Sequence, residues 1–263
     1  MIPFARYDGR KRLKGSFYLS IAMSILAVIV IWVYPSFSEG FRDIDEELLG
    51  AYPDPMLTIF DIRTMATLEG FLAFEMYIFG FMILLGLYLA YLAAGIVAED
   101  VEHGRMDMLL AMPISRPRLL AERFLALAVP IVVVNAIVAP VILVGAWAVG
   151  ESIGMVDLVA IHLLFVPYLF ACAGIGIVCS VVFDRASIAQ RVALGVTFGL
   201  FLFESLISLT DFEDLGAIAP MRYVDPNAVL LDSEYDLIGA AILTAMTLAM
   251  VLASQWWFSR KDV

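Results

Sequence analysis

The sequence predicts an all-α integral membrane protein with six transmembrane helices, and three observations lead to this fold class. Of the 263 residues, 62% are hydrophobic, whereas a soluble domain of this length is closer to half apolar. Stretches of about 18 residues or more carry few charges, as helices that cross a bilayer do. The residues between these stretches are too few for a separate soluble domain, so we expect one transmembrane domain over residues 1–263.

The amino-terminal residues are expected to form a short helix ahead of the first span. Residues 1–15 are basic and have an apolar side, which predicts a short amphipathic elbow helix in the membrane interface. A frayed basic tail is the alternative. Pro35 is expected to end the first span, and Pro130 and Pro140 to kink the third. The six predicted spans are residues 17–34, 70–97, 124–147, 158–182, 192–209 and 237–257.

Two acidic loops, residues 36–67 and 210–236, lie on the same side of the predicted membrane. The second loop contains the apolar stretches IAPM and NAVLL between its acids, whereas a purely solvated loop would be more polar. Short interfacial or re-entrant helices are therefore expected there, with their backbone buried in protein or lining water.

The distribution of Lys and Arg predicts the orientation, because cytosolic loops carry an excess of both. Thirteen of the 16 lie in the arm, in the segments on its side of the membrane and at the carboxyl end, and three lie in the other loops: Arg42, Arg63 and Arg222. Both termini of a multi-pass protein of the cell membrane are therefore expected in the cytosol.

The composition also excludes several classes of function. A net charge of −11 argues against nucleic-acid binding, which needs a basic face. Such an acidic, lysine-poor chain is typical of proteomes adapted to high salt, as in haloarchaea. Cys172 and Cys179 are too far apart on one predicted helix to form a disulfide. Neither His103 nor His162 has the spacing of a metal ligand, so no metal site is expected.

The longest polar stretch on the predicted cytosolic side is EDVEHGRMDMLLAMPISRPRLLAER, residues Glu99–Arg123. Its apolar residues at 101, 108, 109 and 112 share one face of a helix expected over Val101–Met112, which Pro113 would end. An idle loop has no need of such a face. We interpret the segment as a docking element for another protein, and a plain interfacial helix lying on lipid is the alternative.

The chain contains no phosphate-binding P-loop, which needs Gly-Lys followed by Ser or Thr. Its three lysines, Lys11, Lys14 and Lys261, are followed by Arg, Gly and Asp. If ATP drives this protein, a separate chain must bind it.

The docking element resembles the cytosolic coupling segment of ABC-2-type permeases, a family of export permeases. That segment has an acidic residue, a glycine, an apolar run with paired leucines, and then Pro-apolar-Ser-Arg. The matching residues are Glu102, Gly104, Leu109, Leu110, Pro113, Ser115 and Arg116. Arg105 stands where the family often has Thr. The basic arm, residues 52–73 and the final FSRKDV are similar to the elbow helix, the lead-in to the second span and the usual close of the family. The E-A-A pattern of uptake permeases does not occur.

This resemblance implies a permease subunit of an ATP-driven exporter, built from two permease copies as a homodimer and two ATPase subunits. ATP and Mg²⁺ would bind to the ATPase partner, so this chain is expected to bind no cofactor and not to be an enzyme. The expected contacts with the ATPase are Glu99, Glu102, Gly104, Arg105, Met108, Leu109, Pro113, Ser115 and Arg116, with a smaller contact at Asp184 and Arg185.

Two acids fall inside predicted spans, Glu75 and Glu204. A charge at membrane depth is unfavourable and is often functional, so both are candidates for a substrate or gating role. Snorkelling, or pairing across a dimer, is the alternative. His162 is expected to be a packing residue. A run of small residues, Ala171, Ala173, Gly174 and Gly176, predicts close helix packing.

Two other classes of function stay open. A membrane enzyme acting on lipids would need clustered acids, a His dyad or a Ser–His pair at membrane depth. A secondary transporter would usually show internal repeats and broken helices. The sequence displays none of these features clearly, and it does not specify a substrate.

Overall fold

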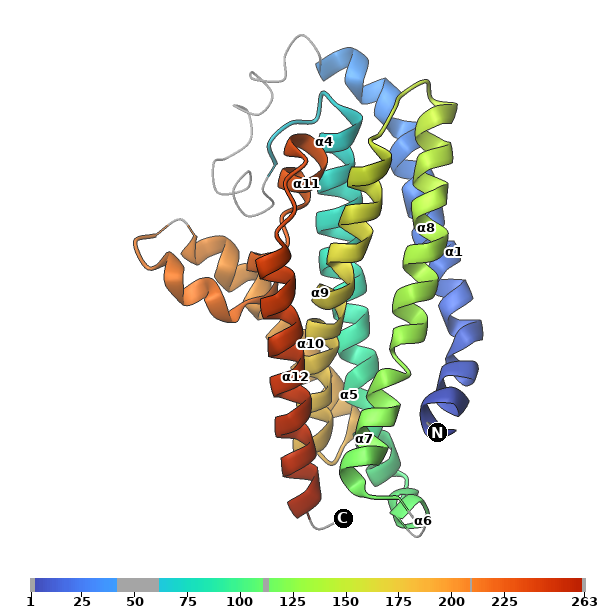
Figure 1. Ribbon diagram of the computed structural model, residues 1–263, viewed down its shortest axis with the longest axis vertical. Helices are drawn as coiled ribbons and strands as arrows, with labels where there is room; N and C mark the ends of the chain where they lie inside the picture. Colours follow the sequence, from blue (N-terminus) through green and yellow to red (C-terminus); the bar gives the residue numbers. More distant parts are fainter. Residues whose placement is uncertain (1–2, 42–61, 111–113, 209, 262–263) are drawn as a thin grey trace.

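The computed structural model describes residues 3–41, 62–110, 114–208 and 210–261, and within these ranges it contains helices and no strands (Figure 1). Six helical segments of the described chain are long and apolar enough to cross a membrane, and each overlaps one predicted span. They are Ala5–Ser36, Leu68–Glu102, Arg116–Ala148, Met155–Val182, Ala186–Ile207 and Leu237–Arg260. The all-α fold with six candidate spans is therefore confirmed.

The first helix, α1 (Pro3–Phe41), differs from the expectation at both ends. The basic arm continues directly into the span, so no separate elbow helix precedes it within residues 3–41. At the other end the helix passes through Pro35. Proline removes one hydrogen bond and bends a helix, but neighbouring turns can carry the helix past it. α1 packs mainly against α8 (Ala128–Ala148).

The second span consists of three stacked segments, α4 (Leu68–Leu72), η1 (Ala73–Leu85) and α5 (Gly86–Glu102). The side chain of Thr67 caps α4 by accepting a hydrogen bond from the Gly70 N–H at 3.2 Å. η1 is a π-helix, which the uniformly apolar sequence did not predict. π-Helical turns are rare and occur frequently at functional sites.

The third span is broken before its proline. α7 (Arg116–Leu125) ends at Leu125 and α8 begins at Ala128. Pro130 lies in the first turn of α8. Backbone N–H groups there have no acceptor within the helix, so the lack of an N–H in proline costs no helical hydrogen bond. The break therefore falls earlier than the expected kink, and Pro140 lies inside α8.

The fourth span, α9 (Met155–Val182), packs against α5, α8, α10 (Ala186–Ile207) and α12 (Leu237–Arg260), so it is the central helix. Its glycines make this possible. A Cβ at Gly176 would collide with the Ala90 carbonyl of α5, and one at Gly174 would lie 2.6 Å from Cε of Met250 in α12. The predicted close packing of this small-residue run is confirmed.

Short helices form between the last two spans, as expected for residues 210–236. They are the 3₁₀ helices η2 (Glu213–Ile218) and η3 (Pro220–Tyr223) and the α-helix α11 (Pro226–Asp232). η2 projects from the side of the bundle, η3 packs against α9 and α12, and α11 lies beside α4 (Figure 1). Asp225 caps α11 by accepting hydrogen bonds from the N–H groups of Asn227 and Ala228.

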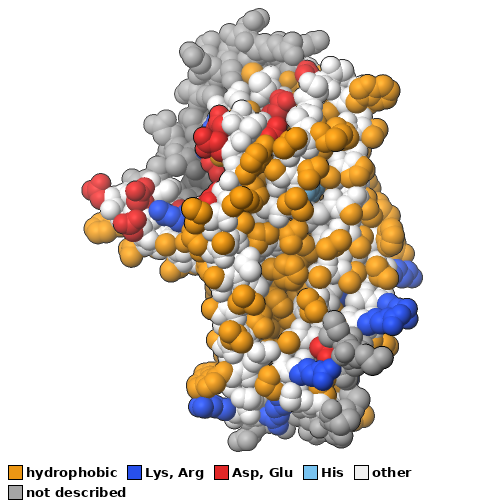
Figure 2. Space-filling view, viewed as in Figure 1, with side chains coloured by type: hydrophobic (Ala, Val, Ile, Leu, Met, Phe, Trp, Pro, Cys, Tyr) orange, Lys and Arg blue, Asp and Glu red, His pale blue; other side chains and the backbone are white. Residues whose placement is uncertain are grey.

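The surface of the bundle has three zones that differ in side-chain type. Hydrophobic side chains cover the middle, Lys and Arg gather at one end, and Asp and Glu gather at the other (Figure 2). The end with Lys and Arg, called the basic end below, also holds α6 (Met106–Leu110) and both ends of the described chain. The opposite end is called the acidic end.

Candidate partner-docking site

The docking element predicted from the sequence lies at the basic end, and its helix is interrupted. α5 ends at Glu102, and Gly104 adopts φ +64°, a left-handed conformation that favours glycine. The Gly104 N–H donates to the Val101 carbonyl and the Arg105 N–H to the Asp100 carbonyl, at 3.1 and 2.8 Å. This is the Schellman arrangement that ends helices. The prediction of one helix from Val101 to Met112 was therefore wrong.

After this turn, α6 lies across the end of the second span with one side buried. Met106 is 2% exposed, whereas Met108 is 68% exposed. Leu109 is partly buried and packs against the hydrophobic core. The expected helix end at Pro113 lies outside the described residues. α6 is thus fixed to the bundle on one side and presents an apolar side chain to its surroundings on the other.

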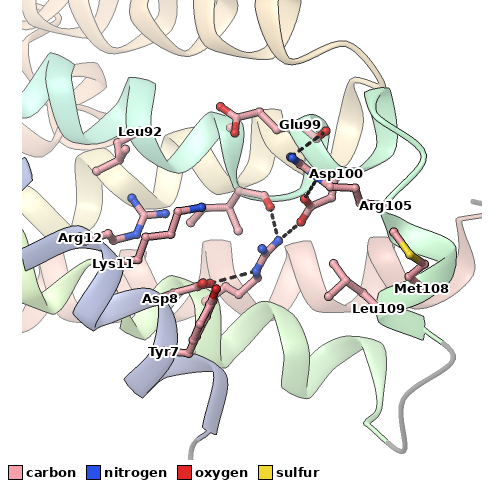
Figure 3. A pocket seen from close by; sticks show the side chains of 13 residues that line it. Tyr7, Asp8, Lys11, Arg12, Leu92, Glu99, Asp100, Arg105, Met108 and Leu109 are labelled. Atoms are coloured by element: carbon pink, nitrogen blue, oxygen red, sulfur yellow. Dashed lines mark hydrogen bonds and ion pairs between the residues drawn. The ribbon is translucent and has the colours of Figure 1, made fainter.

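A cluster of four charged residues holds this turn against the neighbouring helices (Figure 3). The buried Asp100 carboxylate accepts from Arg105 Nε at 2.9 Å and from Arg123 Nη1 of α7. Arg123 Nε also donates to Asp8 Oδ2 of α1 at 3.1 Å, and its Nη1 donates to the Ile96 carbonyl at 2.7 Å. The cluster therefore joins α1, α5 and α7 directly behind α6.

Glu102 joins the docking element to the second predicted contact. Its carboxylate accepts a hydrogen bond from the Ala186 N–H at 2.9 Å, at the first turn of α10. A carboxylate stabilises this position because the first N–H groups of a helix lack partners within the helix. Glu99 makes a longer contact nearby, 3.4 Å from Gln190 Nε2.

A seam of small residues continues this junction along α5 and α10. Its members are Ala90, Ala94, Ala98, Cys179, Ala186, Ala189 and Ala193. Small side chains let two helix backbones approach closely. α5 and α10 therefore pack as one unit beneath the two cytosolic segments predicted from the sequence.

The remaining predicted contact residues fall into two groups. Arg116 is turned inward: it donates to the carbonyls of Phe258 and Lys261 and lies over the Phe258 ring, 5.7 Å from its centre. Asp184 is exposed and forms an ion pair at 2.6 Å with Lys261, whose side chain is largely buried. Two further predicted residues are exposed, Ser115 and Arg185.

Sequence reasoning missed Asp8, Asp100 and Arg123 as members of the site. Asp100 and Arg123 lay inside the segment that was singled out, and their burial would have been the signal. Asp8 lies 115 positions from its partner, and no local spacing indicates such a pair. Within the described residues, no group of three or more His, Cys, Asp and Glu could hold a metal ion.

The two acids expected at membrane depth lie apart from this site and form no contact with each other among the described residues. Glu204 pairs with Arg222 of the same chain at 3.4 Å, and its Oε2 is buried without a hydrogen bond. Glu75 lies in η1 and has no ion pair within the described chain.

His162 belongs to a buried polar chain that crosses three spans. Its Nε2 lies 3.2 Å from the Tyr77 hydroxyl, and its Nδ1 lies 2.8 Å from Asn135 Oδ1. Asn135 Nδ2 donates to the Ile131 carbonyl, so its Oδ1 accepts from His162 Nδ1–H and the neutral imidazole accepts from Tyr77. Both ring nitrogens have partners, as expected of a packing residue.

Comparison with known proteins identifies a family for most of the chain. Residues 55–256 match the family described as ABC-2 family transporter protein. This range covers more than half of the chain and includes the docking element, four of the six candidate spans and most of the last one. No curated protein sequence matches the chain significantly. The chain therefore belongs to the ABC-2 transporter family, as a multi-pass membrane component of an ABC transporter.

Proposed function

We propose that this chain is the permease subunit of an ATP-driven exporter and that separate ATPase subunits dock on α6 at the cytosolic side of the membrane. The observation that carries the proposal is the contrast within α6: Met106 is buried and Met108 is 68% exposed. An apolar side chain held on a fixed, solvent-facing helix is what a partner's hydrophobic cleft can bind.

The second element of the proposal is rigidity behind α6. A force on α6 reaches α5 through a single turn at Gly104, and the Asp100–Arg123 pair connects that turn to α7. The capping bond between Glu102 and Ala186 connects it to α10. Closure of the ATPases would therefore move three helices together instead of bending one loop.

The movement would continue along the second span toward the acidic end. α5 leads directly into the π-helix η1, whose Tyr77 is bonded to His162 of α9. A π-helical segment can shift between hydrogen-bonding registers. We infer that η1 is where tilting of α5 is converted into opening of the outward path.

The positive-inside rule supports the orientation, because the basic end would face the cytosol and both termini would lie there. A second copy of the chain would complete a homodimer. An exposed face of α10 supports this, since Gly195 and Gly199 are spaced as in GxxxG motifs of associating membrane helices. A Cβ at either glycine would meet no atom within 4 Å, so this face has room for a second helix.

We propose that residues 1–263 form one permease domain without catalytic residues. ATP and Mg²⁺ would be held by the partner ATPase, and this chain would bind no cofactor of its own. The export direction rests on the likeness of the docking element to that of export permeases. The two acids in the spans, Glu75 and Glu204, remain proposed sites for substrate passage or gating.

The test is ATP hydrolysis by the complex of permease and ATPase in lipid vesicles. Met108→Asp should reduce the permease-stimulated rate by about tenfold or more, as the loss of a central contact does. Met155→Asp is the matched control, because Met155 is also an exposed methionine, at 60%, but lies at the start of α9 near the acidic end. An unchanged rate in Met108→Asp, with the protein inserted and folded, would overturn the docking role of α6.

A further inference from the structure

A cavity of about 500 Å³ lies behind the docking element, and its lining comes from the start of α1, the end of α5, the region of α6, and Arg123 of α7. Cavities of this size hold small molecules or headgroups. Side chains of both charges point into it, together with the apolar Leu92, Ile96 and Leu109 (Figure 3). The proposed coupling uses Met108, Asp100 and Arg123 of this lining, but it gives no role to Lys11 or Arg12.

The charges in the cavity do not balance one another. Asp8 forms an ion pair with Arg123, and Asp100 forms ion pairs with both Arg105 and Arg123. The third carboxylate, Glu99, is exposed and lies 3.4 Å from Gln190 Nε2.

Two cations remain, Lys11 and Arg12, and neither forms an ion pair within the part of the chain that the structure describes. Arg12 is partly buried. A guanidinium withdrawn from water is unfavourable unless an anion pairs with it. Asp8 and Glu99 act favourably on the Arg12 charge without forming an ion pair with it. The lining nevertheless carries four cations and three carboxylates, so an anion from outside the chain would balance its charge.

The position of the cavity indicates which anion is available. On α1, the turns that follow Arg12 expose apolar and aromatic side chains, with Phe17 and Tyr18 more than half exposed. These turns would face lipid, so Lys11 and Arg12 would lie at the level of the headgroups. Phosphodiesters of anionic lipids are concentrated there and attract Lys and Arg, and a guanidinium can hold two phosphate oxygens at once.

We propose that this cavity binds the phosphate headgroup of an anionic phospholipid from the leaflet at the basic end, through Arg12 and Lys11. The bound lipid would fill the gap between α1 and α5 directly behind α6. The proposal rests on the membrane orientation given under the proposed function, but it does not require the ATPase.

The test measures lipid binding to the purified permease alone, in detergent, by native mass spectrometry. The probes are short-chain phosphatidylglycerol, phosphatidylcholine with the same chains, and inorganic phosphate. The variant Lys11→Gln/Arg12→Gln removes the cavity cations. The control Arg10→Gln/Lys14→Gln removes the same charge from exposed positions of the same arm that do not line the cavity.

Phosphatidylglycerol should bind in preference to phosphatidylcholine, and its affinity should fall about tenfold or more in the cavity variant but less than twofold in the control. Arg12→Lys should keep most of the binding, which separates loss of the site from loss of the fold. Equal losses in the two double variants would indicate general surface attraction and overturn the proposal. Displacement of the lipid by an equal concentration of inorganic phosphate would overturn the lipid as the ligand. Because no ATPase is present, failure here leaves the test of α6 unaffected.

Discussion

Glu102 caps the first turn of α10 from another part of the chain: its Oε2 lies 2.9 Å from the Ala186 backbone nitrogen. The contact joins the link between the second and third spans to the link between the fourth and fifth. Both links were expected to contact the same partner. A single hydrogen bond to a charged group therefore connects the two places on which the ATPase is proposed to act.

Removal of this cap should weaken the junction. Glu102→Ala leaves the Ala186 N–H without its acceptor, so the free energy of unfolding should fall by about 1 kcal/mol. Thermal unfolding of the purified protein measures the loss. Glu99→Ala is the control, because it removes a carboxylate three positions away that makes only a long contact to Gln190. Equal destabilisation by the two changes would contradict the capping role.

The buried carboxylate behind α6 should matter far more to stability than an exposed one. Asp100→Asn leaves two guanidinium groups, those of Arg105 and Arg123, without their shared partner. Because Arg105 is about half exposed and Arg123 keeps its pair with Asp8, the free energy of unfolding should fall by about 1–3 kcal/mol. Asp232→Asn breaks a pair with Arg63 in which both side chains are exposed, and it should cost less than about 1 kcal/mol. Unfolding midpoints that shift equally would show that the cluster is not a structural anchor.

The contact between α9 and α5 depends on the absence of one side chain. Gly176→Ala would place a methyl group against the Ala90 carbonyl, and overpacking of this kind costs about 1–3 kcal/mol. Gly15→Ala is the matched change at an exposed helical glycine with no atom within 4 Å, and it should be neutral or stabilising. The yield of folded protein and its unfolding temperature distinguish the two. Tolerance of both changes would refute the close packing.

The proposed homodimer makes a separate prediction about α10. Gly195→Ile/Gly199→Ile adds bulk to an exposed face, so it should leave the fold of one chain intact and reduce the fraction of dimer. Light scattering of the protein in detergent measures that fraction. Gly15→Ile, on the equally open face of α1, should leave the dimer unchanged. A stable dimer in the double variant would show that the interface does not lie on this face of α10.

The sequence allowed the spans to be placed because hydrophobicity alone decides which stretches enter a bilayer. All six predicted spans overlap helices of sufficient length. It also indicated where the docking element lies, since apolar residues among charges are unusual in a loop. The sequence also contained a signal for the break after Glu102, although one continuous helix was predicted there. Gly104 is the type of residue that a left-handed helix end favours.

Other features could not have been predicted from local patterns. The π-helical hydrogen bonding of η1 could not be predicted, because all its residues except Glu75 are apolar or glycine and such a segment shows no periodicity that distinguishes one helix type from another. The bond between Asp8 and Arg123 depends on how α1 meets α7. The inward orientation of the Arg116 side chain likewise depends on where α12 ends, because the two carbonyls that accept its hydrogen bonds lie there.

The most direct test of the account is cross-linking from α6 to the ATPase. In Met108→Cys, a photoactivatable label can be placed on the new thiol, because Cys172 and Cys179 are both buried. Labelled membranes containing the complex with its ATPase should yield a covalent permease–ATPase product. The same label on Met155→Cys, near the acidic end, should yield none. An intact, co-purifying complex that gives no product from position 108, or gives as much from position 155, would contradict the claim that α6 is where the ATPase docks.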